Sequence, residues 1–179
     1  MILEDRTMEF VKEFDENDDF MVYPMAPERC TAEDVKEVET ALGIKLPEEY
    51  KAHILGEIEG GVLVEADESI GFRKRGGGAA WMFYSGLHTF SPSKESEDWM
   101  RIEVVGKEFI EKTGLKAVPI LKIICDADVY CVDDSGKIVR YNHEGNTLTQ
   151  INMNFWELLD CELKALNERK EMMKNQMKK

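Results

Sequence analysis

The chain has 179 residues, 43% of them apolar, and carries a net charge of -13 from 36 acidic and 23 basic side chains. This length and apolar content are enough for one substantial core, so we expect one domain. The negative charge excludes nucleic acid and anionic membranes as partners, because it repels both, and it favours a basic protein. A purely solubilising role is the alternative interpretation of the same charge.

The first ten residues, MILEDRTMEF, carry acids where a signal peptide would carry lysines. No uncharged apolar run approaches the length that spans a bilayer. We therefore expect a cytoplasmic protein, in which the four cysteines are reduced and are mostly buried as small apolar residues. A disulfide between Cys125 and Cys131 across a hairpin is the alternative.

The N-terminal segment predicts a helix followed by an extended arm. Residues 8–14 have a helical pattern, and residues 15–27 read as a turn and then extended chain. We expect residues 1–30 to form this helix and arm, packed on a single domain that spans residues 31–166. Residues 167–179 are expected to be the basic end, or tail, of a C-terminal helix, because bases outnumber acids there.

The segment 31–61 predicts two helices joined by a tight turn. Thr31 caps the first helix, with Asp34 at the position of a capping-box acid, and its apolar residues recur at steps of three and four. Gly43 ends that helix, and Pro47 begins the second because the first turn needs no N–H from it. The buried stripes are expected to comprise Val35, Val38, Ala41 and Leu42 in the first helix and Tyr50, Ile54 and Ile58 in the second.

Most of the remaining chain has the patterns of β-strands. The sequence DDSG at 133–136 is a turn signal between two of them, which predicts an antiparallel hairpin. The expected strands are 62–65, 69–73, 80–84, 87–90, 117–124, 128–133, 137–142 and 147–151.

Two further helices are expected among and after these strands. Residues 96–113 predict a helix with one apolar side, formed by Trp99, Ile102, Val105, Phe109 and Ile110. The last helix follows its cap Asn154, with Glu157 three residues later, and packs Phe155, Leu159, Leu163 and Leu166. Because the helices do not alternate with the strands, we expect an α+β fold: one domain whose mostly antiparallel sheet is flanked by helices.

The sequence patterns of catalytic and metal sites are all incomplete. Gly76-Gly77-Gly78 lacks the Gly-Lys-Ser/Thr ending of a phosphate loop, and Ser85 lacks the first glycine of a nucleophile elbow. The aspartates at 126–134 lack the spacing of a calcium loop, and the three histidines, at 53, 88 and 143, are far apart. We therefore expect no enzymatic activity, no cofactor and no metal. A buried titratable pair in a cleft would support the enzyme alternative.

Several motifs, taken in order, resemble the SUKH superfamily over residues 31–165. They are the glycine pair Gly60-Gly61, the hairpin VPI…VYCVDDSGKIVRY, the closing helix, and an E-x-x-L-G-x-x-L-P-x-x-Y core formed by Glu39, Leu42, Gly43, Leu46, Pro47 and Tyr50. One residue departs from the family: Glu59 stands where an asparagine usually precedes the glycines. This superfamily contains the fungal regulator of cell-wall glucan synthesis and many bacterial immunity proteins.

The resemblance implies a non-enzymatic binding protein. Bacterial members are implied to be immunity proteins that neutralise a cognate toxin, often a nuclease, by direct binding. Nuclease domains are basic because they hold phosphates, so a basic toxin domain is the expected partner of this acidic chain. A regulatory scaffold like the fungal member is the alternative function. We expect a monomer or a weak dimer.

We expect the partner to contact loops at one edge of the sheet. Trp81 and Tyr84 would be its aromatic anchors, although Trp81 at the start of a strand could equally belong to the core. The acids expected to supply charge are Glu59, Glu65, Asp67, Glu68, Asp126 and Asp128. Solvated surface acids without any partner are the alternative for these six.

Overall fold

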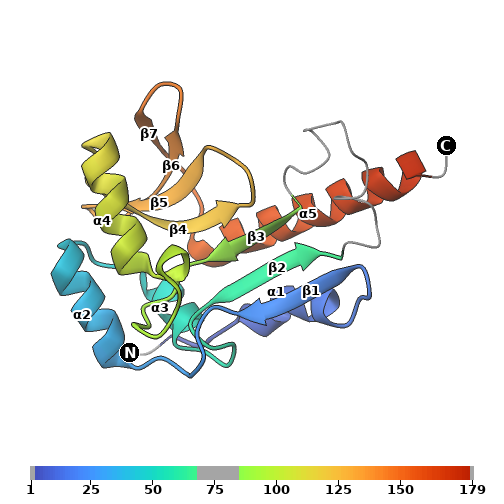
Figure 1. Ribbon diagram of the computed structural model, residues 1–179, viewed down its shortest axis with the longest axis horizontal. Helices are drawn as coiled ribbons and strands as arrows, with labels where there is room; N and C mark the ends of the chain where they lie inside the picture. Colours follow the sequence, from blue (N-terminus) through green and yellow to red (C-terminus); the bar gives the residue numbers. More distant parts are fainter. Residues whose placement is uncertain (1–2, 68–84, 178–179) are drawn as a thin grey trace.

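The computed structural model describes residues 3–67 and 85–177 (Figure 1), with side chains to residue 175. Its strands form one antiparallel sheet in which each strand pairs with the next along the chain. The predicted α+β fold is thereby confirmed, while the strands expected at 69–73 and 80–84 lie outside the described residues. The strands are β1 (Phe20–Pro24), β2 (Val62–Ala66), β3 (Gly86–Thr89), β4 (Ala117–Ile123), β5 (Val129–Asp133), β6 (Ile138–Asn142) and β7 (Thr147–Gln150).

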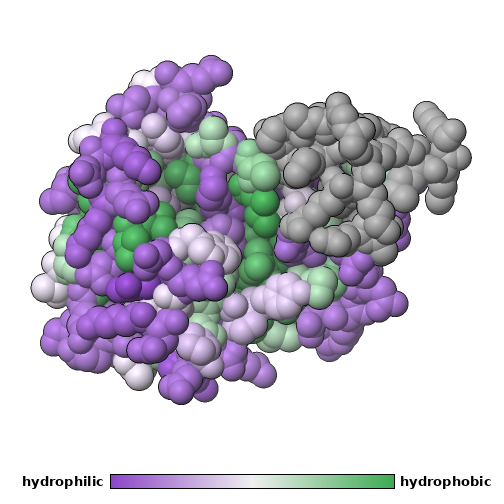
Figure 2. Space-filling view, in the orientation of Figure 1, coloured by the Kyte–Doolittle hydropathy of each residue, from purple (hydrophilic) through white to green (hydrophobic). Residues whose placement is uncertain are grey.

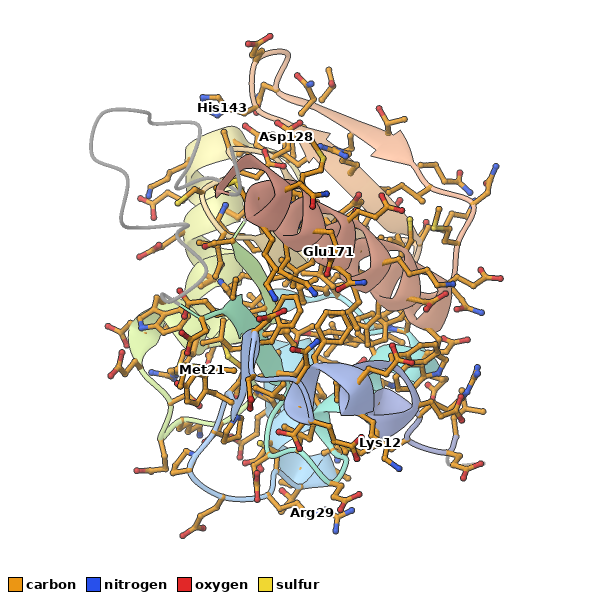
Figure 3. The ribbon with its side chains drawn as sticks, turned by 90° about the vertical axis from the view of Figure 1, so that its right-hand side faces the viewer. Lys12, Met21, Arg29, Asp128, His143 and Glu171 are labelled. Carbon is orange, nitrogen blue, oxygen red and sulfur yellow. The ribbon has the colours of Figure 1, made fainter. Side chains whose placement is uncertain are left out.

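Helices lie on both sides of this sheet. Figures 1 and 3 show α1 and α5 against one face, whereas α4 lies against the other face beside β4. The helices are α1 (Thr7–Asp15), α2 (Ala32–Leu42), α3 (Glu48–Ile54), α4 (Ile102–Thr113) and α5 (Phe155–Met177), with a short 3-10 turn, η3 (Asp98–Met100). None of the described helices has the length and apolar character needed to cross a bilayer.

The sheet has two cores because its alternate residues face different helices. Tyr130 and Val132 belong to the main core, which also contains the buried side chains of α1, α2, α3 and α5. Val129 and Cys131 point the other way and pack with Phe109 of α4 in a smaller core. This period-2 division is what a strand covered on both faces requires.

The predicted helical hairpin is confirmed, including its capping box. The Thr31 backbone N–H donates to Asp34 Oδ2 at 2.7 Å, and the Asp34 N–H donates to Thr31 Oγ1 at 3.3 Å. Glu39 of the motif stabilises the turn between α2 and α3. Its carboxylate accepts a hydrogen bond from the Leu46 N–H at 2.9 Å and lies 3.4 Å from Lys51 Nζ. One expected core position was wrong, because Ala41 is exposed. Ile58 packs against the main core as expected, but it lies beyond the end of α3.

The predicted helix at 96–113 was placed too early, which misplaced Trp99. The Ser91 N–H donates to the Met100 carbonyl at 2.7 Å, and the Ile102 N–H donates to the Ser91 carbonyl at 2.9 Å. These bonds hold residues 98–100 in the 3-10 turn, so α4 begins at Ile102. Trp99 is consequently outside the helical stripe and 46% exposed.

Within the described residues, the arm and the basic part of α5 contact the rest of the domain through specific pairings. The extended arm is the edge strand β1, which pairs with β2. The basic end of α5 lies beside the α1–β1 turn, where Asp19 Oδ2 is 3.2 Å from Lys170 Nζ and 2.5 Å from Lys174 Nζ. Lys170 and Met173 are buried there, so this part of the helix packs on the domain.

The four cysteines are free thiols, and the disulfide alternative is therefore not realised. Cys30 and Cys131 are buried as expected, but Cys125 and Cys161 are exposed. The reason lies in their positions: Cys131 is in a strand covered on both faces, whereas Cys125 is in the β4–β5 turn.

Gly60, the first residue of the glycine pair, can be compared with Gly114 in a matched test of close packing. Gly60 and Gly114 both have left-handed backbone, with φ of 70° and 73°. A Cβ at Gly60 would lie 2.6 Å from Ala26 Cβ and Ser91 Oγ, whereas at Gly114 nothing in the described residues lies within 4 Å.

Both alanine variants, Gly60→Ala and Gly114→Ala, should carry about 1–2 kcal/mol of backbone strain. Gly60→Ala should lose about 1–3 kcal/mol more through overpacking. Equal melting temperatures would mean that Ala26 and Ser91 move aside without cost.

Candidate partner-binding site

Four of the six predicted acids lie at one end of the sheet. Glu65 pairs with Gly86 across β2 and β3, and the Ile124 N–H donates to the Gly86 carbonyl at 2.9 Å. The ends of β2 and β4 therefore flank the start of β3 at the same end of the sheet, which places Glu65 and Asp67 at the end that also carries the β4–β5 turn with Asp126 and Asp128. Sequence reasoning could group these acids because strand ends in an antiparallel sheet meet at alternate turns.

Glu59 does not join this group. It precedes β2 and therefore lies at the opposite end of the sheet, where its carbonyl accepts the N–H groups of Met25 and Ala26, both at 3.0 Å. The expectation of a single acidic edge that includes Glu59 was therefore wrong. The remaining predicted site residues, Glu68, Trp81 and Tyr84, lie outside the described residues.

Asp126 and Asp128 have structural partners within their own chain. Arg140 Nη2 lies 3.7 Å from Asp126 Oδ2 and 3.4 Å from Asp128 Oδ2. The other oxygen of Asp128 accepts the His143 N–H at 2.9 Å, and Figure 3 shows both residues at the same end of the molecule. These contacts order two adjacent turns and offset part of the negative charge, so this pair offers less charge to a partner than the sequence indicates.

The structure reveals a second feature, which we call the open face. It is the side of β1 to β3 that is opposite α1 and α5, together with the end of β4 at Lys122, next to which α4 packs on the rest of β4. The strand register places Tyr23, Leu63, His88 and Lys122 opposite one another in one row across it. Met21 and Tyr23 are 44% and 38% exposed on this face. Figure 3 shows Met21 on the side of the sheet away from α1 and α5, and Figure 2 shows apolar surface in the middle of this side.

Trp99 extends the open face beyond the end of β3. Its indole ring meets the His88 ring edge-on, with 5.3 Å between centroids, and its Nε1–H donates to Glu97 Oε2 at 2.6 Å. Burial lowers the pKa of His88, with Lys122 adding to the effect, so the imidazole is neutral at neutral pH. Its Nδ1–H donates to the Thr89 carbonyl at 2.9 Å. The indole is thus held in place while much of its surface remains accessible.

The SMI1/KNR4 family (SUKH-1) matches residues 29–161. This chain belongs to that family. The SMI1/KNR4 match confirms the suspected superfamily and contains β2 to β7, while α1 and β1 precede it. A comparison with curated proteins found no match.

The open face combines the matched range with the N-terminal segment that precedes it. Trp99 and His88 lie within the SMI1/KNR4 match, whereas Met21 and Tyr23 come from β1. Sequence reasoning missed these exposed side chains because it treated β1 as an arm and placed Trp99 in a helix. One signal was available: the run FMVYP is apolar at odd and even positions, as in a strand whose two faces both contact other groups.

A buried polar chain connects the N-terminus to the sheet. His53 Nδ1 lies 2.7 Å from Thr7 Oγ1, and His53 Nε2 lies 2.8 Å from Thr89 Oγ1. His53 is 1% exposed and Thr89 is fully buried, so a substrate could not reach them. Within the described residues, no cluster of three side chains is arranged to hold a metal ion. These polar groups stabilise the fold, and the open face is the better candidate for function.

Proposed function

We propose that this SMI1/KNR4 family member is a non-enzymatic immunity protein that neutralises a cognate basic toxin domain, such as a nuclease, by direct binding. The observation that carries the proposal is the exposure of Met21, Tyr23 and Trp99 on one face of a strongly acidic chain. A group of large apolar side chains on one surface is typical of a binding site. Aromatic residues supply much of the binding energy in such sites.

The charge around the open face supports a basic partner. Glu65 lies on the face, Asp67 lies at one end of it, and Glu97 and Asp98 lie beside Trp99 at the other. Arg101 offsets part of this charge, because it is 3.8 Å from Asp98 and 3.5 Å from Glu103. A surface with apolar anchors and acidic surroundings suits a protein whose own surface carries Lys and Arg for phosphate binding.

Affinity capture tests the proposed function. The tagged protein would be incubated with an extract of its source cells, washed at low and then high salt, and analysed by mass spectrometry. Recovery of one basic toxin domain, released progressively by salt, and loss of that domain's activity when the purified proteins are mixed, would support immunity. Recovery of wall-synthesis or signalling proteins would instead support a regulatory scaffold, and no specific partner would contradict a binding function.

Charge reversal beside Trp99 should slow association with the toxin domain. Asp98 is 84% exposed at its side chain, so Asp98→Lys should change the free energy of unfolding by only about 0.5 kcal/mol. We expect the association rate at low salt to fall by up to about tenfold and its salt dependence to become shallower. Stopped-flow or surface plasmon resonance would measure both.

The matched control is Glu168→Lys, an equal charge change at an exposed position of α5 on the other side of the sheet. If the two variants slow association equally, the effect comes from net charge alone, and Asp98 does not lie near the interface.

A further inference from the structure

We propose that the basic partner lies across the open face and inserts one large apolar side chain into a groove between α4 and β4. This inference rests on the proposed function and specifies its contact geometry. The groove has a volume of about 210 Å³ and opens to solvent. Its apolar lining is formed by Phe90, Val105, Phe109, Pro119, Val129 and Tyr141.

The groove is built to keep its shape without an occupant. Phe109 of α4 and Tyr141 of β6 meet edge-on, with 4.9 Å between ring centroids, and both belong to the smaller core. Pro119 lies in the middle of β4, opposite Cys131. A cavity of about 150 Å³ is large enough to hold benzene, so a phenylalanine or leucine side chain fits a groove of this size. A preformed apolar pocket is the usual environment of an interface hot spot.

The groove is continuous with the row of side chains on the open face. Lys122 lines the groove and also lies opposite His88 in the row. Phe90 lines it too, and its ring centroid is 4.9 Å from that of His88. Four neighbouring strands span about 14 Å, since adjacent strands are roughly 4.8 Å apart. About ten residues of helix cover that distance, so one segment of a partner could contact Tyr23 and reach the groove.

Charge distinguishes the basic partner from a second copy of this chain. Two copies would each bring a net charge of -13 and the same acids, Glu97 and Asp98, to the contact. The two lysines at the groove do not remove this repulsion, because Lys122 Nζ already donates to the Asp126 carbonyl and Lys112 is accompanied by Glu108. The occupant that fits is therefore a segment with one aliphatic or aromatic side chain flanked by Lys and Arg.

Four variants test the contact with the purified toxin domain recovered by affinity capture. Ala127 is exposed and lines the groove, so Ala127→Trp should fill it without disturbing the core. Ala127→Trp and Trp99→Ala should each raise the Kd by about 30-fold, the effect expected of a hot spot. The controls are Ala41→Trp, at an exposed position on α2, and Met172→Ala, which truncates a 60% exposed side chain on α5. Both controls should bind like the wild type.

The outcomes separate this inference from the proposed function. If the toxin domain binds Ala127→Trp and Trp99→Ala as tightly as the wild type, the docking geometry is wrong while the immunity function stands. If no basic protein binds the wild type, both proposals fail. Iodide quenching gives a check that needs no partner: the difference between wild type and Trp99→Phe isolates the fluorescence of Trp99. A shielded Trp99 in the free protein would mean that the open face is already covered, and would overturn the inference alone.

Discussion

Replacing Tyr50 by alanine is expected to lower the free energy of unfolding by about 3–5 kcal/mol, the range for a large aromatic side chain removed from a core. The Tyr50 side chain is fully buried, and its ring meets Phe155 edge-on with 5.0 Å between centroids. Its hydroxyl donates to the Phe90 carbonyl at 2.8 Å and accepts the Phe90 N–H at 3.1 Å. One side chain thus joins α3, α5 and the end of β3, and urea unfolding would measure its contribution.

Two further tyrosine variants divide this effect into its parts. Tyr50→Phe keeps the ring but leaves the N–H and carbonyl of Phe90 without their partner, which should cost about 1–3 kcal/mol. Tyr23→Ala is the control for aromatic truncation, since Tyr23 is 38% exposed on the open face, and should change the free energy of unfolding by less than about 1 kcal/mol. An alanine variant at position 50 as stable as the Tyr23 variant would show that the ring contributes little to the core.

Acidification from pH 7 to pH 4 is expected to remove about 3 kcal/mol of stability through His53 alone. Burial lowers the pKa of His53 from 6.5 to about 4, although the charge of Asp5 partly opposes this. Between about pH 4 and pH 6.5, His53 binds a proton in the unfolded protein but not in the folded protein. The contribution of His53 is therefore fully present above about pH 6.5 and is lost as the pH falls toward 4.

The hydrogen bonds around His53 explain why the folded protein keeps it neutral. The Thr7 hydroxyl donates to Asp5 Oδ1 at 2.5 Å, so Thr7 Oγ1 accepts from the Nδ1–H of His53 at 2.7 Å. Thr89 Oγ1 accepts the Val62 N–H at 2.9 Å, and its own hydrogen is directed to His53 Nε2. A proton on Nε2 would clash with that hydroxyl hydrogen, so protonation would break the hydrogen bond between His53 and Thr89.

Urea unfolding as a function of pH would test this prediction. His53→Gln should be less stable than the wild type at pH 7 but should lose less stability between pH 6.5 and pH 4. Part of the pH dependence should remain, because burial also lowers the pKa of His88. His143→Gln is the matched control at an exposed histidine and should follow the wild type. An unchanged pH dependence in His53→Gln would show that other groups cause the acid sensitivity.

Local signals predicted the helices and hairpins well. The capping box at Thr31 and Asp34, the left-handed Gly43, and the turn between β5 and β6 each depend on residues close together in the sequence. The sequence could also bring four acids to one end of the sheet. It could not show that Asp126 and Asp128 face Arg140, because that contact depends on the register of β6 against β5.

The open face escaped prediction for the same reason. Whether Tyr23 is buried depends on which face of the sheet the helices cover, and α1 and α5 cover the other one. Trp99 left its expected helical stripe because Ser91, eight positions earlier, fixes the turn before α4. The exposure of Tyr23 and the position of Trp99 both depend on contacts between segments that are distant in the sequence, and a short sequence pattern does not contain such contacts.

The sequence by itself determined the order of helices and strands, because periodicity and capping depend on neighbouring residues. Composition determined the acidic character, and the motifs taken in order carried the resemblance to the family. Only the tertiary structure decided which apolar residues stay exposed and which acids are offset by a base. Burial and ion pairing are set by the packing of distant segments, and the open face with its adjoining groove is the result of that packing.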